Sequence, residues 1–240
     1  MIKKAFEYIV GLAEPHFREY EGYLYSDKPL ERIDYNPKAA KIEMNTLSSL
    51  IDYIKANIDE MSGKMIIHVQ SPTKVQMYSS LDYERKREYM VEVNASVPHF
   101  SFNEFTEHEA FCINLQSKFM DISSTDRALL LKFAGTVEAG TVAEYGDDGV
   151  TQKATVKTGI ASKGEAIVPN PVTLCPYRTF VEVEQPLSQY IFRMKQDKYD
   201  GIQCALFEAD GGAWKIEAMK SIKAYLEAQL EGIEGFIVIS

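Results

Sequence analysis

The chain has 240 residues, of which 45% are hydrophobic and 25% are charged. These proportions are those of an ordinary globular protein and exclude a disordered chain, a coiled-coil rod and a collagen-like fibre. The length predicts one or two domains. The formal net charge of −9 argues against strong, sequence-independent binding of nucleic acid by the chain as a whole, because such binding depends on Lys and Arg side chains that neutralise phosphates.

The first residues predict an amphipathic helix. Its apolar residues recur at helical spacing on one face, at Ile2, Phe6, Ile9, Val10 and Ala13. Glu7 and Glu14 interrupt the stretch, so we expect neither a secretory signal peptide nor a membrane span. Residues 14–44 are rich in tyrosine and interrupted by proline, which predicts an extended segment with short strands.

Residues 45–100 predict one helix followed by three strands. Asn45 or Thr46 can cap the helix. Its apolar face is formed by Leu47, Leu50, Ile51, Ile54 and Ile58. Strands are expected at residues 65–70, 74–79 and 88–97. The short links between them favour antiparallel neighbours.

Residues 101–140 predict two further helices. The apolar stripe of the first consists of Phe105, His108, Cys112, Leu115 and Phe119. The second begins at Ser124 or Thr125, and its stripe consists of Leu129, Leu130, Phe133, Ala134 and Val137. Residues 101–150 hold nine acidic and three basic residues, which a solvated helix face explains more simply than an acidic recognition surface.

After Gly140 the pattern changes to short strands. The sequence predicts a turn at residues 146–149 and strands at 151–158, 165–168, 179–184, 189–195 and 202–208. The last two strands flank residues 197–201, which give the strongest hairpin signal in the chain. A final helix is expected at 212–230, with Met219, Ile222, Leu226 and Leu230 on one face. A strand at 236–239 can pair within the fold or complete the sheet of a neighbouring copy.

This order predicts an α+β fold with mixed, mainly antiparallel sheets and helices packed on them. Three parts are expected: an N-terminal helix and sheet lobe at 1–100, a central helical pair at 101–140, and a β-rich lobe with the C-terminal helix at 141–240, unless all three form one continuous domain. The three cysteines are odd in number and lie in apolar surroundings, at Cys112, Cys175 and Cys204. Reduced packing thiols in a cytoplasmic protein are the simple interpretation.

We find no residue pattern typical of catalysis or of cofactor binding. No two of the four histidines share the spacing of a metal motif, and no C-x-x-C occurs. His108 lies on an apolar stripe, which favours a partly buried histidine over a metal ligand. A nucleophile elbow, a P-loop and a dinucleotide fingerprint are also missing. We therefore expect no catalytic residue, no metal and no cofactor, and a protein that is not an enzyme.

One basic cluster is a candidate contact for a partner. Arg85, Lys86 and Arg87 lie in the predicted link between two strands, beside Tyr83 and Tyr89. Basic side chains next to aromatic rings can contact a nucleic-acid strand or an acidic protein. The alternative, which we favour, is a solubilising turn that blunts a sheet edge.

Four features follow one another in a recognisable order. They are the helix from Leu47 to Ile58 before a strand, the aromatic group of Phe100, Phe102 and Phe105 before a helix, the change to strands after Gly140, and the hairpin from Tyr190 to Phe207 before the final helix. The aromatic group is more simply a core plug than a stacking platform. Over roughly residues 45–230 the pattern resembles the YfdQ-like phage and prophage proteins of unknown function. The resemblance implies a soluble, cytoplasmic phage product and carries over no activity and no residue role. The chain lacks the tryptophans typical of the aromatic group, and its single tryptophan is Trp214.

We therefore expect a phage- or prophage-encoded accessory protein that binds a macromolecular partner, most simply a protein, and that assembles into a homo-oligomer. Interference with host defence is one version, since complementary charge would steer an acidic protein into a basic cleft. One alternative is a nucleic-acid-binding accessory of phage recombination that uses Arg85, Lys86 and Arg87. Another is an enzyme whose site is assembled from distant residues, such as His68, His99 and a carboxylate.

Overall fold

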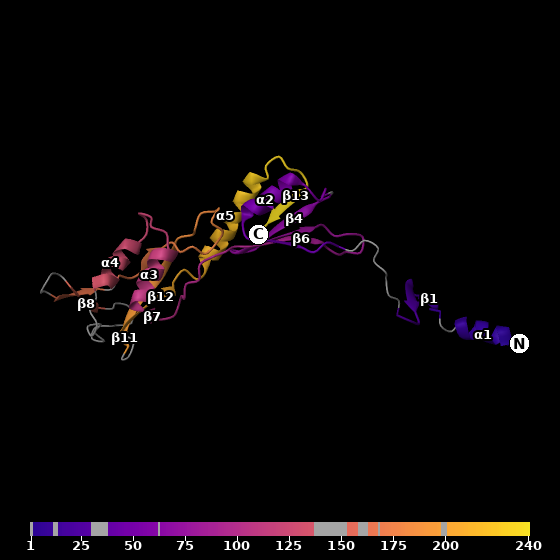
Figure 1. Ribbon diagram of the computed structural model, residues 1–240, viewed down its shortest axis with the longest axis horizontal. Helices are drawn as coiled ribbons and strands as arrows, with labels where there is room; N and C mark the ends of the chain where they lie inside the picture. Colours follow the sequence, from indigo (N-terminus) through magenta and orange to yellow (C-terminus); the bar gives the residue numbers. More distant parts are fainter. Residues whose placement is uncertain are drawn as a thin grey trace. The chain divides into compact units, whose positions relative to one another are not determined.

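The structure is a computed structural model that describes eight stretches of the chain. They are residues 2–11, 14–29, 38–61, 63–136, 153–157, 163–167, 169–197 and 201–240. The chain divides into two compact units, Met1–Ala39 and Ala40–Ser240. We call them unit 1 and unit 2 and describe each by itself, with the element labels of Figure 1.

The described residues of unit 1 include one helix and one hairpin. The predicted amphipathic helix is confirmed as α1 (Ile2–Gly11). The hairpin joins β1 (Phe17–Tyr20) to β2 (Tyr23–Ser26) in antiparallel register. Its two-residue turn has positive φ at both Glu21 and Gly22, as the favoured hairpin turns require. No residue of α1, β1 or β2 is buried.

The larger sheet of unit 2 has five strands. They are β3 (Ile42–Met44), β4 (Met65–Ser71), β5 (Lys74–Ser79), β6 (Tyr89–Asn94) and β13 (Phe236–Ile239). Their order in the sheet is β13-β4-β5-β6-β3. The central three strands are antiparallel, as predicted, whereas the edge strands β3 and β13 are each parallel to their neighbour. The segment at 236–239 therefore pairs within the fold.

Two helices cover one face of this sheet. They are α2 (Leu47–Ala56) and α5 (Ala213–Gln229), which Figure 1 shows on the same side of the strands. The side chain of Thr46 caps α2 by accepting a hydrogen bond from the Ser49 amide at 3.2 Å. Alternating strand residues and the predicted helix stripes meet in one core, which includes Leu50, Ile54, Ile67, Val75, Met77, Val93, Ile222 and Leu226. We call the opposite side of the sheet, away from α2 and α5, the outer face.

The second sheet of unit 2 is antiparallel. Its strands are β7 (Thr106–Glu107), β10 (Val172–Leu174), β11 (Ser188–Asp197) and β12 (Gly201–Glu208). The order is β10-β11-β12-β7, and the pair Asp197↔Gly201 confirms the predicted hairpin. The helices α3 (His108–Lys118) and α4 (Arg127–Thr136) pack against it. A second core forms there, with Phe111, Leu115, Leu130, Tyr190, Phe192 and Leu206.

In the sequence, the residues of the second core lie between the two groups of residues that form most of the first core. Nearly all of the first core comes from residues 47–93 and 222–230, whereas the second comes from 111–206. Residues 38–240 otherwise include a small antiparallel hairpin, β8 (Lys153–Lys157) with β9 (Lys163–Ile167). The predicted α+β class with mainly antiparallel sheets is confirmed. The units do not divide at residues 100 and 140, and α5 packs with the first sheet instead of with a lobe at 141–240.

The strand predicted at residues 179–184 is wrong. This stretch is irregular, although Thr179 and Phe180 are buried. The Gln185 side chain replaces a ladder of strand hydrogen bonds, because its Oε1 accepts from the amides of Arg178 and Thr179, at 3.0 and 3.2 Å, and its Nε2 donates to the Phe180 carbonyl at 2.9 Å. The turn predicted at 146–149 lies outside the described residues.

Candidate functional site

The basic cluster predicted as a partner contact lies in the loop between β5 and β6. The Asp82 carboxylate shapes this loop by accepting hydrogen bonds from the amides of Glu84 and Lys86, at 2.9 and 2.8 Å. The Lys86 ammonium pairs with the Glu84 carboxylate at 3.1 Å. Arg85 takes a positive φ of 60° in the turn, and Tyr83 is 84% exposed. One of the two basic side chains of this turn, Lys86, is therefore paired with a carboxylate of the same loop.

Arg87 lies at the end of the same loop, two residues before β6, but its side chain contacts β5. Its Nη1 donates a hydrogen bond to the Ser79 carbonyl at 3.0 Å. Its guanidinium carbon lies 5.2 Å from the centre of the Tyr78 ring, within cation–π range. The structure thus separates Arg87 from Arg85 and Lys86 and places it on the outer face, beside an aromatic residue 9 positions away in sequence.

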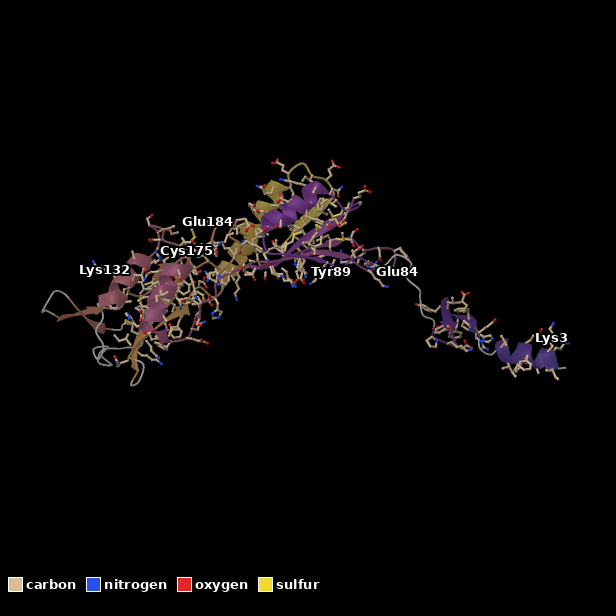
Figure 2. The ribbon with its side chains drawn as sticks, in the orientation of Figure 1. Lys3, Glu84, Tyr89, Lys132, Cys175 and Glu184 are labelled. Carbon is tan, nitrogen blue, oxygen red and sulfur yellow. The ribbon has the colours of Figure 1, made fainter. Side chains whose placement is uncertain are left out.

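Three rings lie in a line on the outer face. The centres of Tyr78 and Tyr89 are 5.3 Å apart, and those of Tyr78 and His68 are 6.3 Å apart. A bulge between Met77 and Tyr78 sets Tyr89 directly opposite Tyr78. Without it, the two-residue period of the strand would turn Tyr89 to the other face. Figure 2 shows Tyr89 on the side of the sheet away from α2.

A polar cluster lies beside these rings. The Glu92 carboxylate accepts hydrogen bonds from Lys41 Nζ at 2.6 Å, from Gln76 Nε2 at 3.0 Å and from Asn94 Nδ2 at 3.2 Å, and it pairs with Lys74 Nζ at 3.1 Å. These donors, Lys41 first, hold the pKa of Glu92 well below its usual range. Lys41 Nζ also lies 3.9 Å from Glu43 Oε1, so two ammonium groups meet two carboxylates and the charges of the cluster balance.

A buried guanidinium lies between the two sheets of unit 2. Arg178 is 7% exposed and stacks on Trp214, with 3.9 Å between its guanidinium carbon and the ring centre. It donates hydrogen bonds to Ser188 Oγ and to Glu208 Oε1, the latter at 3.3 Å. Ser188 Oγ in turn donates to Asp210 Oδ2 at 2.5 Å. Burial lowers the pKa of Arg178, and the neighbouring carboxylates oppose that shift.

A cavity of about 300 Å³ opens beside this network, with Ser188, Asp210, Trp214 and Glu217 in its wall. In and around the network, Arg178 Nε, Tyr190 OH and Trp214 Nε1 are buried without a hydrogen-bond partner. The residues lining the cavity include neither a histidine nor a cysteine. The charged groups of the network contact one another. We therefore interpret the network as a structural brace that holds residues 175–188 in place.

The cysteines serve packing. Cys175 and Cys204 are buried, Cys112 is partly buried, and all three are free thiols. Burial raises the pKa of each thiol, which disfavours the reactive thiolate. Cys112 Sγ lies 3.8 Å from Nε2 of His108, and that nitrogen also lies 2.9 Å from the Ala134 carbonyl. His108 is therefore a hydrogen-bonded, partly buried histidine, as its place on the stripe predicted.

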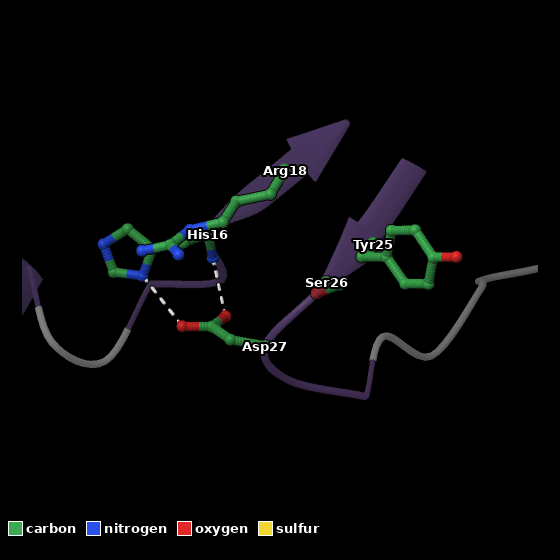
Figure 3. A pocket seen from close by; sticks show the side chains of 5 residues that line it. All are labelled: His16, Arg18, Tyr25, Ser26 and Asp27. Atoms are coloured by element: carbon green, nitrogen blue, oxygen red, sulfur yellow. Dashed lines mark hydrogen bonds and ion pairs between the residues drawn. The ribbon is translucent and has the colours of Figure 1, made fainter. Parts of the chain in front are cut away.

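Unit 1 has a surface hollow of about 400 Å³, which Figure 3 shows with His16, Arg18 and Asp27 in its wall. The amide of His16 donates to Asp27 Oδ1 at 2.7 Å, and His16 Nδ1 lies 3.0 Å from Asp27 Oδ2. The backbone hydrogen bond is the main cause of the lowered pKa of Asp27. Both side chains are half exposed, so water competes with the pair. The contact between His16 and Asp27 closes the end of the hairpin opposite its turn.

The contacts of His68 and His99 bear on the alternative of an enzyme site assembled from distant residues. His68 contacts the Tyr78 ring, and the carbonyl of His99 accepts a hydrogen bond from Lys118 Nζ at 2.5 Å. In the described stretches, the histidine that meets a carboxylate is His16. Over the same stretches, no three His, Cys, Asp or Glu residues are placed to hold a metal ion.

Unit 1 exposes most of its apolar residues. On α1 the exposed fractions are 75% for Ile2, 65% for Phe6 and 60% for Ile9 and Val10. On the hairpin, Tyr20, Tyr23 and Leu24 are exposed by 66 to 71%. No helix within the described part of the chain is both long and apolar enough to cross a membrane.

Sequence reasoning missed the ring line and the Arg178 network. A bulge decides which face Tyr89 occupies, and the sequence gives no local signal for it. The network joins residues up to 36 positions apart. Comparison with known protein families, with characterised proteins and with solved structures finds no match for this chain.

Proposed function

We propose that this protein is a phage- or prophage-encoded accessory protein that acts by binding a protein partner, and that residues 2–29 form the contact. One observation carries the proposal: the helix and hairpin of this segment bury none of their apolar side chains. Contiguous exposed apolar surface is unfavourable in water and marks interaction sites. The phage origin rests on the resemblance over residues 45–230.

The helix α1 has the pattern of a segment that docks into an apolar groove. Ile2, Phe6, Ile9 and Val10 share one face, while Lys4 and Glu7 lie on the other. Burying one such side chain stabilises a complex by about 1.5–3 kcal/mol. Four of them supply a gross gain comparable to the ~8 kcal/mol of a micromolar complex, before the cost of ordering the segment.

The charge of the chain favours a basic partner. At −9, long-range attraction would speed the encounter with a positively charged surface and repel an acidic one. A host protein with a basic nucleic-acid-binding cleft fits this description, and its occupation would interfere with defence. The apolar contact of α1 would then hold the complex after the charges have steered it.

The test compares three full-length forms in a pull-down from phage-infected bacteria. We expect the wild type and Lys4→Ala to recover the same specific protein, and Phe6→Asp/Ile9→Asp to lose it. Lys4→Ala is the matched control, because it changes the polar face of the same helix. Equal recovery by all three forms, or recovery of no specific protein by the wild type, would refute the proposal.

A further inference from the structure

We propose that the outer face of the five-stranded sheet binds single-stranded nucleic acid, independently of the protein contact proposed for residues 2–29. The face joins a line of rings, Tyr89, Tyr78 and His68, to the cationic side chains of Lys41, Lys74 and Arg87. Aromatic rings and cations on an open surface are the two components of single-strand recognition.

The rings provide the stacking platform. Tyr89 lies at the end of the line and is 50% exposed, so it is the ring that we propose for stacking on a base. Arg87 already lies over Tyr78, which keeps a cation at the place where a phosphate would follow a stacked base. Five strands about 4.8 Å apart make a platform roughly 20 Å wide, enough for about three or four nucleotides.

The charge of this face differs in sign from that of the whole chain. Its contacts join three cations, Lys41, Lys74 and Arg87, to two carboxylates, Glu43 and Glu92. These groups sum to +1 in a chain of −9, so a polyanion is repelled less here than by the chain as a whole. Lys41 and Lys74 converge on Glu92 and remain 41% and 32% exposed, so both ammonium groups can reach a phosphate.

The same features favour a single strand over a duplex. A duplex keeps its bases stacked inside, so it cannot use the rings, and it must be held through its phosphates. Three cations offset by two carboxylates are too few for that contact. A single strand can turn its bases onto the rings and present the edges of the bases to Gln70 and Asn94, which are exposed on neighbouring parts of the sheet.

The apolar residues at the edge of the face suggest a second candidate occupant. Ile237 and Ile239 are 49% and 39% exposed and could meet a second copy of the chain. A sheet of this size offers less area than a standard stable interface, and two identical net-positive faces repel. We therefore favour nucleic acid, and self-association is one outcome of the test.

The test is fluorescence anisotropy with the full chain and a labelled ten-nucleotide oligodeoxythymidine at about 50 mM salt. Tyr89→Ala should weaken binding about tenfold, the typical effect of one stacked base, and Tyr89→Phe should restore it. The matched control is Tyr83→Ala, which removes a more exposed ring, 84% against 50% for Tyr89, from the β5–β6 loop. We expect this variant, and Arg85→Ala/Lys86→Ala, to bind like the wild type.

Four results would overturn the proposal. They are no binding by the wild type at low salt, equal weakening by Tyr83→Ala, loss of binding only in Arg85→Ala/Lys86→Ala, and equal or tighter binding of a duplex of the same length. Light scattering on the same samples identifies a second copy as the occupant if Tyr89→Ala turns a dimer into a monomer. Because α1 is unchanged in every variant, failure here leaves the pull-down result for residues 2–29 independent.

Discussion

Arg178 shows how one charged residue can be kept inside a small protein. Its guanidinium meets Ser188 and Glu208 through hydrogen bonds, and Trp214 through stacking. Partial burial would raise the pKa of Asp210, but hydrogen bonds from Ser188 and the Gly212 amide, with the charge of Arg178, lower it overall. The planar, forked guanidinium suits this combination of contacts, which an ammonium group cannot reproduce.

The first prediction concerns this guanidinium. Arg178→Ala should lower the free energy of unfolding by about 3 kcal/mol, because it leaves partly buried carboxylates without their cation. Arg178→Lys should lower the free energy of unfolding by about half as much, because the charge is kept and the stacking on Trp214 is lost. Urea unfolding followed by the fluorescence of Trp214, the single tryptophan, measures both. An Arg178→Ala change as small as that of the loop variant Arg85→Ala would contradict the brace.

A second prediction concerns pH and Glu92. Its pKa lies below the ordinary value in the folded protein, chiefly through Lys41, so the carboxylate stabilises the fold above the unfolded pKa of about 4.3. That stabilisation is lost as pH falls through this value toward the folded pKa. Between pH 5 and pH 3 the wild type should lose about 1–2 kcal/mol more stability than Glu92→Gln. Equal losses in parallel urea titrations would count against the cluster.

At the scale of elements, successive residues of β13 alternate between the two faces of the sheet. Val238 pairs with Ile67 and packs on the core, whereas Ile237 pairs with Ile66 and is 49% exposed on the outer face. Val238→Ser should therefore cost about 1–2 kcal/mol of stability. The neighbouring Ile237→Ser should change it by less than about 0.5 kcal/mol. If the thermal melts of the two variants coincide, the strand does not pack as described.

The elements that the sequence predicts correctly are those with a local periodic signal. The stripes of α2 and α5 and the alternation in β4, β5 and β6 depend on neighbours within a few residues. Edge strands β3 and β13 pair with segments far away in sequence, so their parallel direction could not be predicted. The irregular stretch at 179–184 resembles a strand in sequence because it is rich in β-branched and aromatic residues, and only the contacts of Gln185 reveal the difference.

The candidate site was only partly predictable for the same reason. Arg87 and the aromatic residues near it were recognised in the sequence, but the contact was assigned to the loop with Arg85 and Lys86. The bulge beside Tyr78 decides which face Tyr89 occupies and therefore which rings meet. It leaves no pattern in the residues themselves.

At the scale of the whole molecule, both cores lie within unit 2. No residue of either core comes from residues 2–29. Deleting residues 1–39 should therefore change the melting temperature of the remainder by less than about 2 °C. Deleting residues 1–45 should lower it clearly, because β3 and the partner of Glu92 at Lys41 are lost as well. Circular dichroism melts of the two truncated forms compare them directly, and equal melting temperatures would contradict the division into units.

The position of β13 also sets an order on folding during synthesis. This strand and α5 complete the first sheet and its core from residues 213–239, whereas α2 and β4–β6 are made by residue 94. The second core needs only residues 111–206, so it can form while the first still lacks a helix and an edge strand. We expect the ribosome-bound chain to expose an unfinished apolar face on β4–β6 for more than a hundred residues of elongation. A chaperone would therefore protect this exposed apolar face mainly during that interval.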